Sequence, residues 1–474
     1  MHSNRQVDLC VIGGGSAGLS VAAGAAQLGA RVVLIERDRM GGECLNTGCV
    51  PSKALLAAAK AAQAVRDAKY FGVDAEPAID FKRVHAHVRS VIDAIAPQDS
   101  AERFNKLGVE VIRGEARFFD RHTIIVDSHE IRARRAVIAT GSEPAVPAIT
   151  GLDTVPYWTN ENIFDNDTLP QHLLIVGAGP VGVEIAQAYR RLGARVTMLE
   201  RDRALQKDDP ELARRLLRHL AAEGVVVREG VKVKAVTREN EVIRLSLEET
   251  GQSSELIGSH LLLAAGRKPR TGELRLQAAG IDFDQKGIIV DERLRTRAPG
   301  IYAAGDVVDG PRFTHVCSYH AAIIIKNALF RIPAKIDFRS LSWVTYTDPE
   351  LAQVGMTEEQ ARKQHGNQIR VVRVSYSSND RAQTERQTEG TLKLIADRRG
   401  RVLGASILGA HAGELALLWV VAIENGLRLR DLAQTMAPYP TWGELDKAAA
   451  SEFSRPLLSH PLTRFAAWAL SRLP

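Results

Sequence analysis

Two copies of one glycine-rich pattern constrain the fold of this chain of 474 residues more than any other feature. In each copy an apolar strand, 7–12 or 173–176, precedes glycines in the spacing G-x-G-x-x-G, then a helix, then a second strand that ends in Glu36 or Glu200. The first glycine permits a tight turn, the second lets the backbone approach a pyrophosphate, and the third allows the helix to pack on the sheet. Two complete units therefore predict two bound dinucleotides, one a flavin and the other a nicotinamide.

A pair of cysteines, Cys44 and Cys49, follows the first of these units in a glycine-rich segment, 41–53. Two cysteines separated by four residues can close a small disulfide loop. Pro51 and the Ala-rich run 54–64 predict a helix that starts just beyond Cys49. The positive end of that helix would lower the pKa of the Cys49 thiol, as a reactive cysteine requires. The alternative is a pair of buried free thiols without a redox role.

The cysteine content, the N-terminal segment and the net charge narrow the class of protein to which the chain can belong. The four cysteines (Cys10, Cys44, Cys49 and Cys317) provide no framework of structural disulfides. No charged-then-apolar leader precedes the strand at Val7, so a reducing cytoplasm is expected, and the only disulfide expected there is a catalytic one. The net charge of +6 is not gathered into a basic stripe interleaved with aromatic residues, so nucleic-acid binding is not expected.

Three further segments fit two nucleotide-binding domains. The segments 136–142 and 261–267 are apolar strands that run into Gly141 and Gly266, each about one nucleotide-binding domain after its glycine pattern. The segment 301–306 is an apolar strand that ends in Gly-Asp, which would direct Asp306 toward a ribityl or phosphate group.

Together these motifs resemble the flavin-dependent pyridine nucleotide–disulfide oxidoreductases, the family of lipoamide dehydrogenase, glutathione reductase and mercuric reductase, over essentially the whole chain. The resemblance implies an α/β fold with two doubly wound Rossmann-like dinucleotide-binding domains, for FAD and NAD(P), and an α+β C-terminal dimerisation domain. The domains expected are FAD-binding (1–150 and 271–337), NAD(P)-binding (151–270) and interface (338–454), followed by an amphipathic tail (455–474). The resemblance also implies a homodimer whose active site is shared between subunits.

The chemistry implied by the resemblance is a relay from a nicotinamide through FAD to a Cys44–Cys49 disulfide. Cys49 would be the sulfur beside the flavin, forming a charge-transfer thiolate, and Cys44 the outer sulfur that attacks substrate. Lys53 would lie near the flavin ring and pair with Glu184. The alternative for Lys53 and Glu184 is two unrelated surface charges.

The family pattern also assigns the cofactor-binding residues. Those for FAD are Gly13, Gly15, Ser16, Ala17, Gly18, Glu36, Gly42, Lys53, Thr140, Gly141 and Asp306. Those for NAD(P) are Gly177, Gly179, Val181, Gly182, Glu184, Glu200, Arg201, Lys207 and Gly266. Glu200 would bind the 2′-OH of NADH and repel the phosphate of NADPH, whereas Arg201 and Lys207 would suit NADPH. NADH is the expected cofactor because a carboxylate at the strand end acts directly on the ribose.

The segment 438–444 carries the prediction about substrate. Lipoamide dehydrogenase and glutathione reductase have a histidine base here, oriented by a glutamate, but this chain has Tyr439, followed by Glu444. Tyrosine, with an ordinary pKa near 10, is a poor base at neutral pH. A tyrosine at this place instead resembles mercuric reductase, although the C-terminal cysteine pair of that enzyme is missing, since no cysteine follows Cys317.

The function expected is therefore an FAD-dependent NAD(P)H oxidoreductase that passes electrons through Cys44 and Cys49 to a disulfide or metal-ion acceptor. One alternative is a dihydrolipoyl dehydrogenase, and another is a flavin-bearing, membrane-associated interaction subunit. No metal site is expected, because His315 and His320 do not share a helix face and are interpreted, with Cys317, as packing near the flavin. The tail from 461 predicts a short amphipathic helix that docks on its own dimer or makes weak contact with a membrane surface.

Overall fold

The computed structural model describes residues 5–458 and 460–473, and the chain divides into two compact units. The first unit consists of Met1–Gly177, Ala188–Leu199 and Val231–Ile336. The second consists of Ala178–Gln187, Glu200–Gly230 and Asp337–Pro474.

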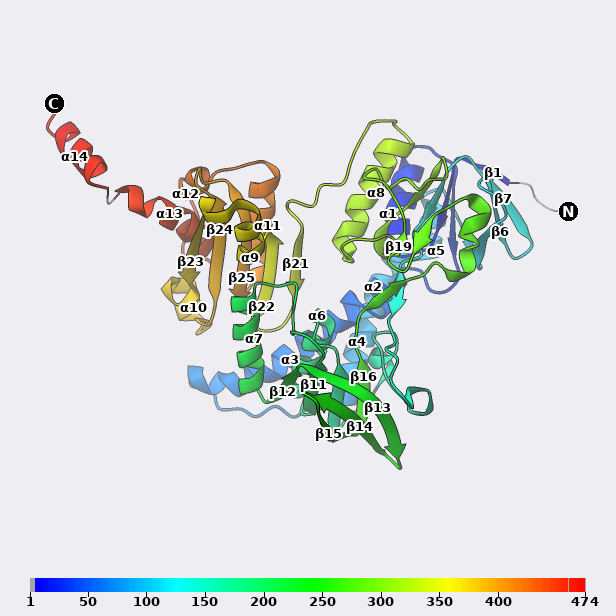
Figure 1. Ribbon diagram of the computed structural model, residues 1–474, viewed down its shortest axis with the longest axis horizontal. Helices are drawn as coiled ribbons and strands as arrows, with labels where there is room; N and C mark the ends of the chain where they lie inside the picture. The colour runs from blue at the N-terminus through cyan, green and yellow to red at the C-terminus, as the bar shows by residue number, and fades with distance from the viewer. Residues whose placement is uncertain (1–4, 459, 474) are drawn as a thin grey trace. The chain divides into compact units, whose positions relative to one another are not determined.

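A five-stranded parallel sheet in the order β20-β8-β2-β3-β4 is the centre of the first unit (Figure 1). Its strands are buried almost throughout, because parallel sheets are covered on both faces and their strands read as continuous apolar runs. The carboxyl ends of β2, β8 and β20 meet at one edge of the sheet, so three segments far apart in the sequence come together there. The strand bounds are β2 Leu9–Ile12, β3 Val32–Glu36, β4 Val109–Arg113, β8 Ala136–Ile138 and β20 Ile301–Ala303.

Helices α1 (Ser16–Gln27) and α8 (Thr314–Ala328) pack against each other beside this sheet, as Figure 1 shows. Their contact is close: a Cβ added at Gly24 of α1 would lie 2.5 Å from Cδ1 of Ile325. The other helices of the first unit are α2 Gly42–Asn46, α3 Cys49–Asp67, α4 Phe81–Ile95 and α5 Ala101–Lys106.

The second glycine pattern follows strand β10 (His172–Val176), which lies between β11 (Arg195–Glu200) and β16 (His260–Leu263) with all three parallel. Helix α6 (Pro180–Arg191) begins within the pattern, and its residues up to Gln187 belong to the second unit. Further strands complete the first unit, and all of them pair antiparallel except β1, which pairs parallel with β7. Their bounds are β1 Arg5–Val7, β5 Ala116–Phe118, β6 Thr123–Val126, β7 His129–Ala133, β9 Ser142–Pro144, β13 Val231–Glu239, β14 Val242–Glu249, β15 Gln252–Gly258, β17 Arg267–Pro269, β18 Phe283–Asp284 and β19 Gly287–Ile288.

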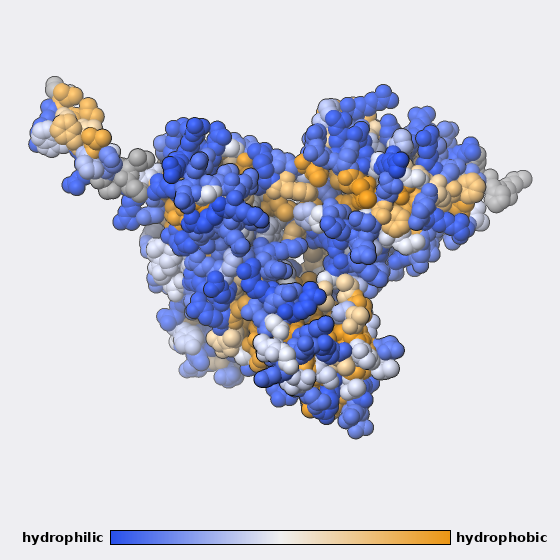
Figure 2. Space-filling model, in the orientation of Figure 1, coloured by the Kyte–Doolittle hydropathy of each residue, from blue (hydrophilic) through white to orange (hydrophobic). Residues whose placement is uncertain are grey.

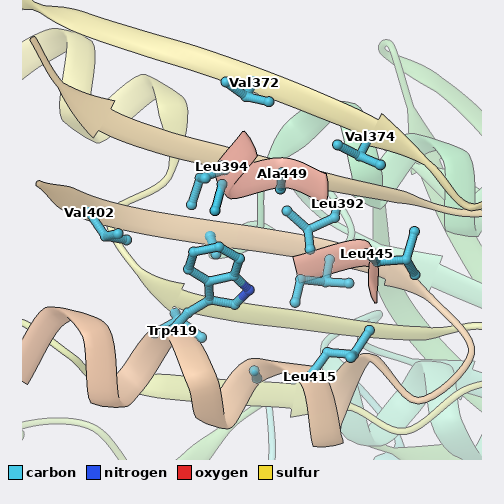
Figure 3. Close-up of a cluster of buried hydrophobic side chains, with 14 of the residues drawn as sticks. Val372, Val374, Leu392, Leu394, Val402, Leu415, Trp419, Leu445 and Ala449 are labelled. Atoms are coloured by element: carbon cyan, nitrogen blue, oxygen red, sulfur yellow. The ribbon is translucent and has the colours of Figure 1, made fainter. Parts of the chain in front are cut away.

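A five-stranded antiparallel sheet in the order β21-β22-β25-β24-β23 forms the core of the second unit. Figure 3 shows Trp419 among Leu392, Leu394 and Leu445 in this core, and the Trp419 side chain is fully buried. Its indole Nε1 donates a hydrogen bond of 2.8 Å to Oδ1 of buried Asp446. The strand bounds are β21 Ser342–Thr345, β22 Glu350–Gly355, β23 Ile369–Ser375, β24 Thr391–Asp397 and β25 Val402–Gly409.

The other elements of the second unit are β12 Val225–Glu229, α7 Pro210–Ala222, α9 Glu358–His365, α10 Asp380–Thr384, α11 Ala412–Glu424, α12 Leu429–Ala433, α13 Glu444–Leu458 and α14 Pro461–Leu470. The parallel and antiparallel layers together confirm the predicted fold class: α/β nucleotide-binding layers with a C-terminal α+β domain.

Helix α14 is the amphipathic helix that the sequence predicts near the C-terminus. All of its residues are at least partly exposed, and apolar side chains gather on it in Figure 2. Phe465 and Trp468 stack on each other with ring centroids 5.8 Å apart. Within residues 5–458 and 460–473, no helix has the length and apolar character needed to cross a membrane.

Candidate functional site

The two cysteines lie on consecutive helices of the first unit. Cys44 is on α2 and Cys49 is the first residue of α3, so the predicted helix begins at Cys49 itself. Their side chains are within hydrogen-bond reach of each other, as the spacing predicts for a pair that can form a disulfide. Cys49 is exposed and Cys44 is half-buried.

Three helix N-termini meet at this pair. The Cys49 sulfur lies 3.4 Å from Oγ1 of Thr314, the first residue of α8. Ser16, the first residue of α1, is a hydrogen-bond partner of Cys44. Because helix N-termini carry partial positive charge, this arrangement stabilises negative charge on a sulfur. Thr314 was not a predicted site residue, and its contact depends on the pairing of α1 with α8, which the local sequence does not reveal.

The thiols share a proton unequally. The hydrogen bond with Cys49 is the main cause that raises the pKa of the Cys44 thiol, and burial raises it further. In a coupled pair the second proton is harder to remove than the first. Cys44 therefore holds its proton more tightly than an ordinary thiol does; the thiolate at Cys49 stays a prediction.

A network of polar side chains stands beside the cysteine pair and was not predicted from the sequence. The Arg267 guanidinium forms an ion pair with Glu43 and donates from Nε to Oγ of Ser142 at 2.8 Å. Asn160 Nδ2 donates to Oε1 of Glu43 at 2.9 Å. Burial raises the pKa of Glu43 to about 7, while Arg267 acts in the opposite direction. Glu43 precedes Cys44 in the chain, so this network fixes the helix that carries the outer sulfur.

The first glycine pattern forms a backbone cradle. Gly13 has φ of +109°, and a Cβ there would lie 2.4 Å from the carbonyl oxygen of Ala139. A Cβ on Gly42 would lie only 2.6 Å from Cα of Gly15, so the cysteine segment closes over the turn with no room for side chains. A cradle lined by backbone at a helix N-terminus fits a pyrophosphate, as FAD binding requires.

Other predicted FAD residues surround this cradle. Glu36 ends β3, and its carboxylate accepts hydrogen bonds from the amides of Gly14 at 2.5 Å and Asp38 at 2.8 Å. Asp306, which follows β20, accepts a hydrogen bond of 2.7 Å from Oγ of Ser142. Thr140 donates from Oγ1 to the carbonyl of Arg270 at 2.8 Å. The predicted residues placed at this edge by the sheet are Gly13, Gly15, Ser16, Ala17, Gly18, Glu36, Gly42, Thr140, Gly141 and Asp306.

The second glycine pattern repeats the first closely. Gly177 has φ of +107°, and a Cβ there would lie 2.4 Å from the carbonyl oxygen of Ala264. Glu200 accepts hydrogen bonds from the amides of Ala178 at 2.8 Å and Asp202 at 3.0 Å, as Glu36 does in the first pattern. This turn also fits a dinucleotide, with Glu200 held where a ribose is expected.

The remaining predicted NAD(P) residues differ in exposure. Val181 is 49% exposed, whereas Gly182 is buried in the first turn of α6. Arg201 is exposed and pairs with Asp202 at 3.1 Å, and Lys207 is exposed in the loop before α7. No side chain among the described residues comes within 4 Å of a Cβ built at Gly179 or Gly266.

Lys53 and Glu184 belong to different units, so their predicted pairing stays a prediction. Lys53 lies in the first half of α3, with Nζ 3.4 Å from Oγ of Ser52. Glu184 is buried, and its Oε1 accepts a hydrogen bond of 2.8 Å from the amide of Tyr346.

Tyr439 and Glu444 lie in the second unit, at the start of α13. Tyr439 is 70% exposed, and its hydroxyl donates to Oδ2 of Asp380 at 2.9 Å. This hydrogen bond raises the pKa of Tyr439, so the phenol stays protonated at neutral pH. Glu444 is the first residue of α13 and accepts a weak hydrogen bond of 3.4 Å from the amide of Thr441. The two residues are close in the chain, but Glu444 binds backbone rather than Tyr439.

His315, Cys317 and His320 lie on α8. The buried His320 accepts a hydrogen bond of 3.2 Å at Nδ1 from the amide of Gly305, and burial lowers its pKa to about 4. Cys317 is buried, and its sulfur would lie 3.1 Å from a Cβ at Gly305. His315 stacks on Phe313 instead. Two of the three therefore support the turn that presents Asp306, and the described residues contain no cluster suited to a metal ion.

Two family models match the chain. The model described as pyridine nucleotide-disulphide oxidoreductase matches residues 7–321. The model described as the dimerisation domain of pyridine nucleotide-disulphide oxidoreductase matches residues 341–450.

Individual proteins match over nearly their whole length. Mercuric reductase of Streptomyces lividans is 37% identical over 464 residues, which cover 96% of this chain and 98% of the relative. Dihydrolipoyl dehydrogenase of Thermus scotoductus is 37% identical over 453 residues, which cover 93% and 96%. Among solved structures, the Cu(II) complex of the HOCl-induced flavoprotein disulfide reductase RclA from Escherichia coli matches with a TM-score of 0.85 and 29% identity, covering 94% of this chain and 99% of that one.

Proposed function

Since this chain belongs to the pyridine nucleotide-disulphide oxidoreductase family, we propose that it is a reductase that passes electrons from NADH through Cys44 and Cys49 to a soft metal ion. The family binds FAD and a nicotinamide. The flavin, when bound, supplies the two-electron chemistry between the nicotinamide and the cysteine pair.

The residues of the chain prepare the site for this transfer. The backbone cradle at Gly13, Gly15 and Gly42 would hold the pyrophosphate of FAD, and Glu36 would hold its adenosine ribose. The helix N-termini at the cysteines stabilise a thiolate at Cys49, and the hydrogen bond keeps the second proton on Cys44. We propose Cys44 as the sulfur that meets the acceptor, as the family resemblance implies.

The observation that carries the choice of acceptor is the state of Tyr439. Exchange between a dithiol and a disulfide needs a base that takes up a proton, as the family's histidine does. Tyr439 is protonated at neutral pH and hydrogen-bonded to Asp380, so it cannot serve as that base. A soft metal ion that binds the cysteine pair displaces the Cys44 proton to solvent, so no protein base is needed, and thiolates are preferred ligands of soft ions. Mercuric reductases are among the relatives, and one of the solved neighbours is a Cu(II) complex.

NADH is proposed as the electron donor because the Glu200 carboxylate is held where it could bind the 2′-OH of the adenosine ribose. Its two carboxylate oxygens are held by backbone amides at the end of β11, as Glu36 is at the end of β3. Arg201 is engaged with Asp202 rather than left open to a phosphate. The carboxylate would bind a ribose 2′-OH and repel a 2′-phosphate.

The dimerisation domain indicates a homodimer. We propose that each active site combines the cysteines of one subunit with the Tyr439 segment of the other, as the family resemblance implies. A cytoplasmic location is proposed because the four cysteines provide no framework of structural disulfides, which suits a reducing compartment.

A dihydrolipoyl dehydrogenase is the second candidate, favoured by the relative from Thermus scotoductus. Anaerobic stopped-flow reoxidation separates the two. The enzyme is reduced with NADH, and the thiolate-to-flavin charge-transfer band is followed while Hg²⁺, Cu²⁺, lipoamide and glutathione disulfide are offered in turn. Rapid loss of the band with the metal ions alone is expected; rapid loss with lipoamide alone would overturn the metal-ion proposal.

A further inference from the structure

A large basic cavity lies in the first unit at the edge of the parallel sheet opposite the FAD cradle. Its volume is about 1030 Å³. Arg135 directly precedes β8 and Gly300 directly precedes β20, and both line the cavity. The cradle segments follow the carboxyl ends of the same two strands, so the cavity is a separate place from the dinucleotide site. It is broadly open to the outside, and its volume is at the upper end for pockets that bind small organic ligands.

The wall of the cavity, formed by the residues that line it, carries more positive than negative side chains. Two carboxylates line the cavity, Asp282 and Asp291. Six guanidinium groups and one imidazole also line it: Arg121, Arg134, Arg135, Arg295, Arg297, Arg331 and His122. Of these, Arg134 is paired with Asp8 outside the cavity at 3.7 Å. Like charges so close repel one another, and a multiply charged anion would relieve that repulsion.

Both carboxylates are already paired within the wall. Asp291 accepts two hydrogen bonds from the Arg295 guanidinium, at 2.8 and 2.6 Å. Asp282 lies 3.6 Å from Arg297. Arg135 and Arg331 form no ion pair with any carboxylate in the described residues, 5–458 and 460–473. The cavity therefore offers cations that the protein itself does not neutralise.

The wall is held in place by the backbone. The carbonyl of Arg135 accepts from the amide of Cys10 at 3.0 Å, and the segment 291–295 is closed by the hydrogen bond from the Asp291 amide to the Arg295 carbonyl at 2.9 Å. Arg295 also bridges to Tyr302 of β20, whose side chain is buried. The planar guanidinium fork matches phosphate oxygens bidentately and loses less entropy per hydrogen bond than a flexible ammonium group does.

One side of the cavity is apolar. Ile289, Val290, Ala298 and Pro299 line it, and Ile289 is 52% exposed. An apolar side beside a cationic side suits a nucleotide base attached to phosphates, whereas the cationic side alone suits inorganic polyphosphate.

We propose that this cavity binds a multiply charged phosphate anion, with Arg135 and Arg331 as its unneutralised ligands. The phosphate oxygens accept charge-assisted hydrogen bonds from the guanidinium groups. The proposal does not depend on the electron acceptor proposed above.

Isothermal titration calorimetry of the FAD-loaded protein with inorganic triphosphate, at low ionic strength and without pyridine nucleotide, tests the proposal. Saturable binding is expected, weakened at least about tenfold by Arg135→Gln and by Arg331→Gln, because each removes a charge-assisted hydrogen bond. Arg117→Gln, an exposed arginine on β5 that does not line the cavity, is the matched control and should leave the affinity unchanged.

ATP in a second titration distinguishes the two sources of phosphate. Affinity equal to that of triphosphate identifies the phosphates alone as the ligand, whereas tighter ATP binding that Ile289→Ser reduces identifies a nucleotide. Two results would overturn the proposal. One is no saturable binding of triphosphate, and the other is equal affinity in the wild type, Arg135→Gln and Arg331→Gln.

Discussion

Replacing Asp446 by Asn should change how the stability of the second unit depends on pH. Asp446 is 3% exposed and accepts the hydrogen bond from the Trp419 indole. Burial raises the pKa of Asp446 from 3.8 to about 7, against the lowering effect of that hydrogen bond. Asparagine keeps a carbonyl oxygen for the indole and removes the ionisable group.

The sign and size of the effect follow from linkage. In the unfolded chain Asp446 loses its proton near pH 3.8, but in the folded protein it keeps the proton up to about pH 7. The folded state therefore holds more protons between these values, and the stability from this group, fully present below pH 3.8, is lost as pH rises through 7. The total is about 4 kcal/mol at about 1.4 kcal/mol per pH unit.

Thermal unfolding of the wild type and Asp446→Asn from pH 4 to pH 8 measures this difference. Near pH 4 the two proteins should have the same melting temperature. As the pH rises to 7, the melting temperature of the variant should come to exceed that of the wild type by about 10 °C, for a unit of this size. Glu359→Gln, an exposed carboxylate in the same unit, is the control and should follow the wild type throughout. Melting curves of wild type and Asp446→Asn that run parallel over the whole pH range would refute the reasoning.

Three further predictions concern the redox site and one the tail. Cys44→Ser should lower NADH-driven reduction of the acceptor at least about 100-fold while the protein retains FAD, measured by steady-state turnover and flavin absorbance. Glu200→Ser should lower kcat/KM for NADH about tenfold and narrow its advantage over NADPH, measured with both cofactors. Tyr439→His should raise the turnover rate with lipoamide relative to that with Hg²⁺, because histidine supplies the missing base. An unchanged ratio of the two rates would show that the residue at position 439 does not act as the base. Deletion of 461–474 should weaken the dimer in sedimentation experiments; an unchanged dimer with lost binding to anionic vesicles would identify a membrane partner instead.

The two glycine-rich turns were predictable from the sequence because the backbone conformation that they need depends on only a few neighbouring residues. Gly13 and Gly177 adopt positive φ against a neighbouring carbonyl, and no other residue type meets that requirement without strain. The start of α3 at Cys49 was predictable because proline and alanine act within one turn of helix.

The site contacts that were not predicted from the sequence join segments far apart in the chain. Arg267 reaches Glu43 because β17 pairs with β9, and Thr314 reaches Cys49 because α8 packs on α1. Such pairings depend on strand order and on helix packing, which no single segment specifies. One feature of the sequence does point to Arg267. It directly follows Gly266, at the end of a strand-and-glycine segment that resembles the segment 136–141.

The likeness of the two glycine turns has a consequence for how long each ligand stays. Around the first turn, Gly42 lies against Gly15, so the cysteine segment covers whatever the cradle holds. Around the second, Val181 is half exposed and the described residues leave open space at Gly179. With the same cradle in both places, we expect the covering segment to set how fast each ligand exchanges. A dinucleotide at the first turn should stay bound as a prosthetic group, and one at the second should leave after each turnover as a co-substrate.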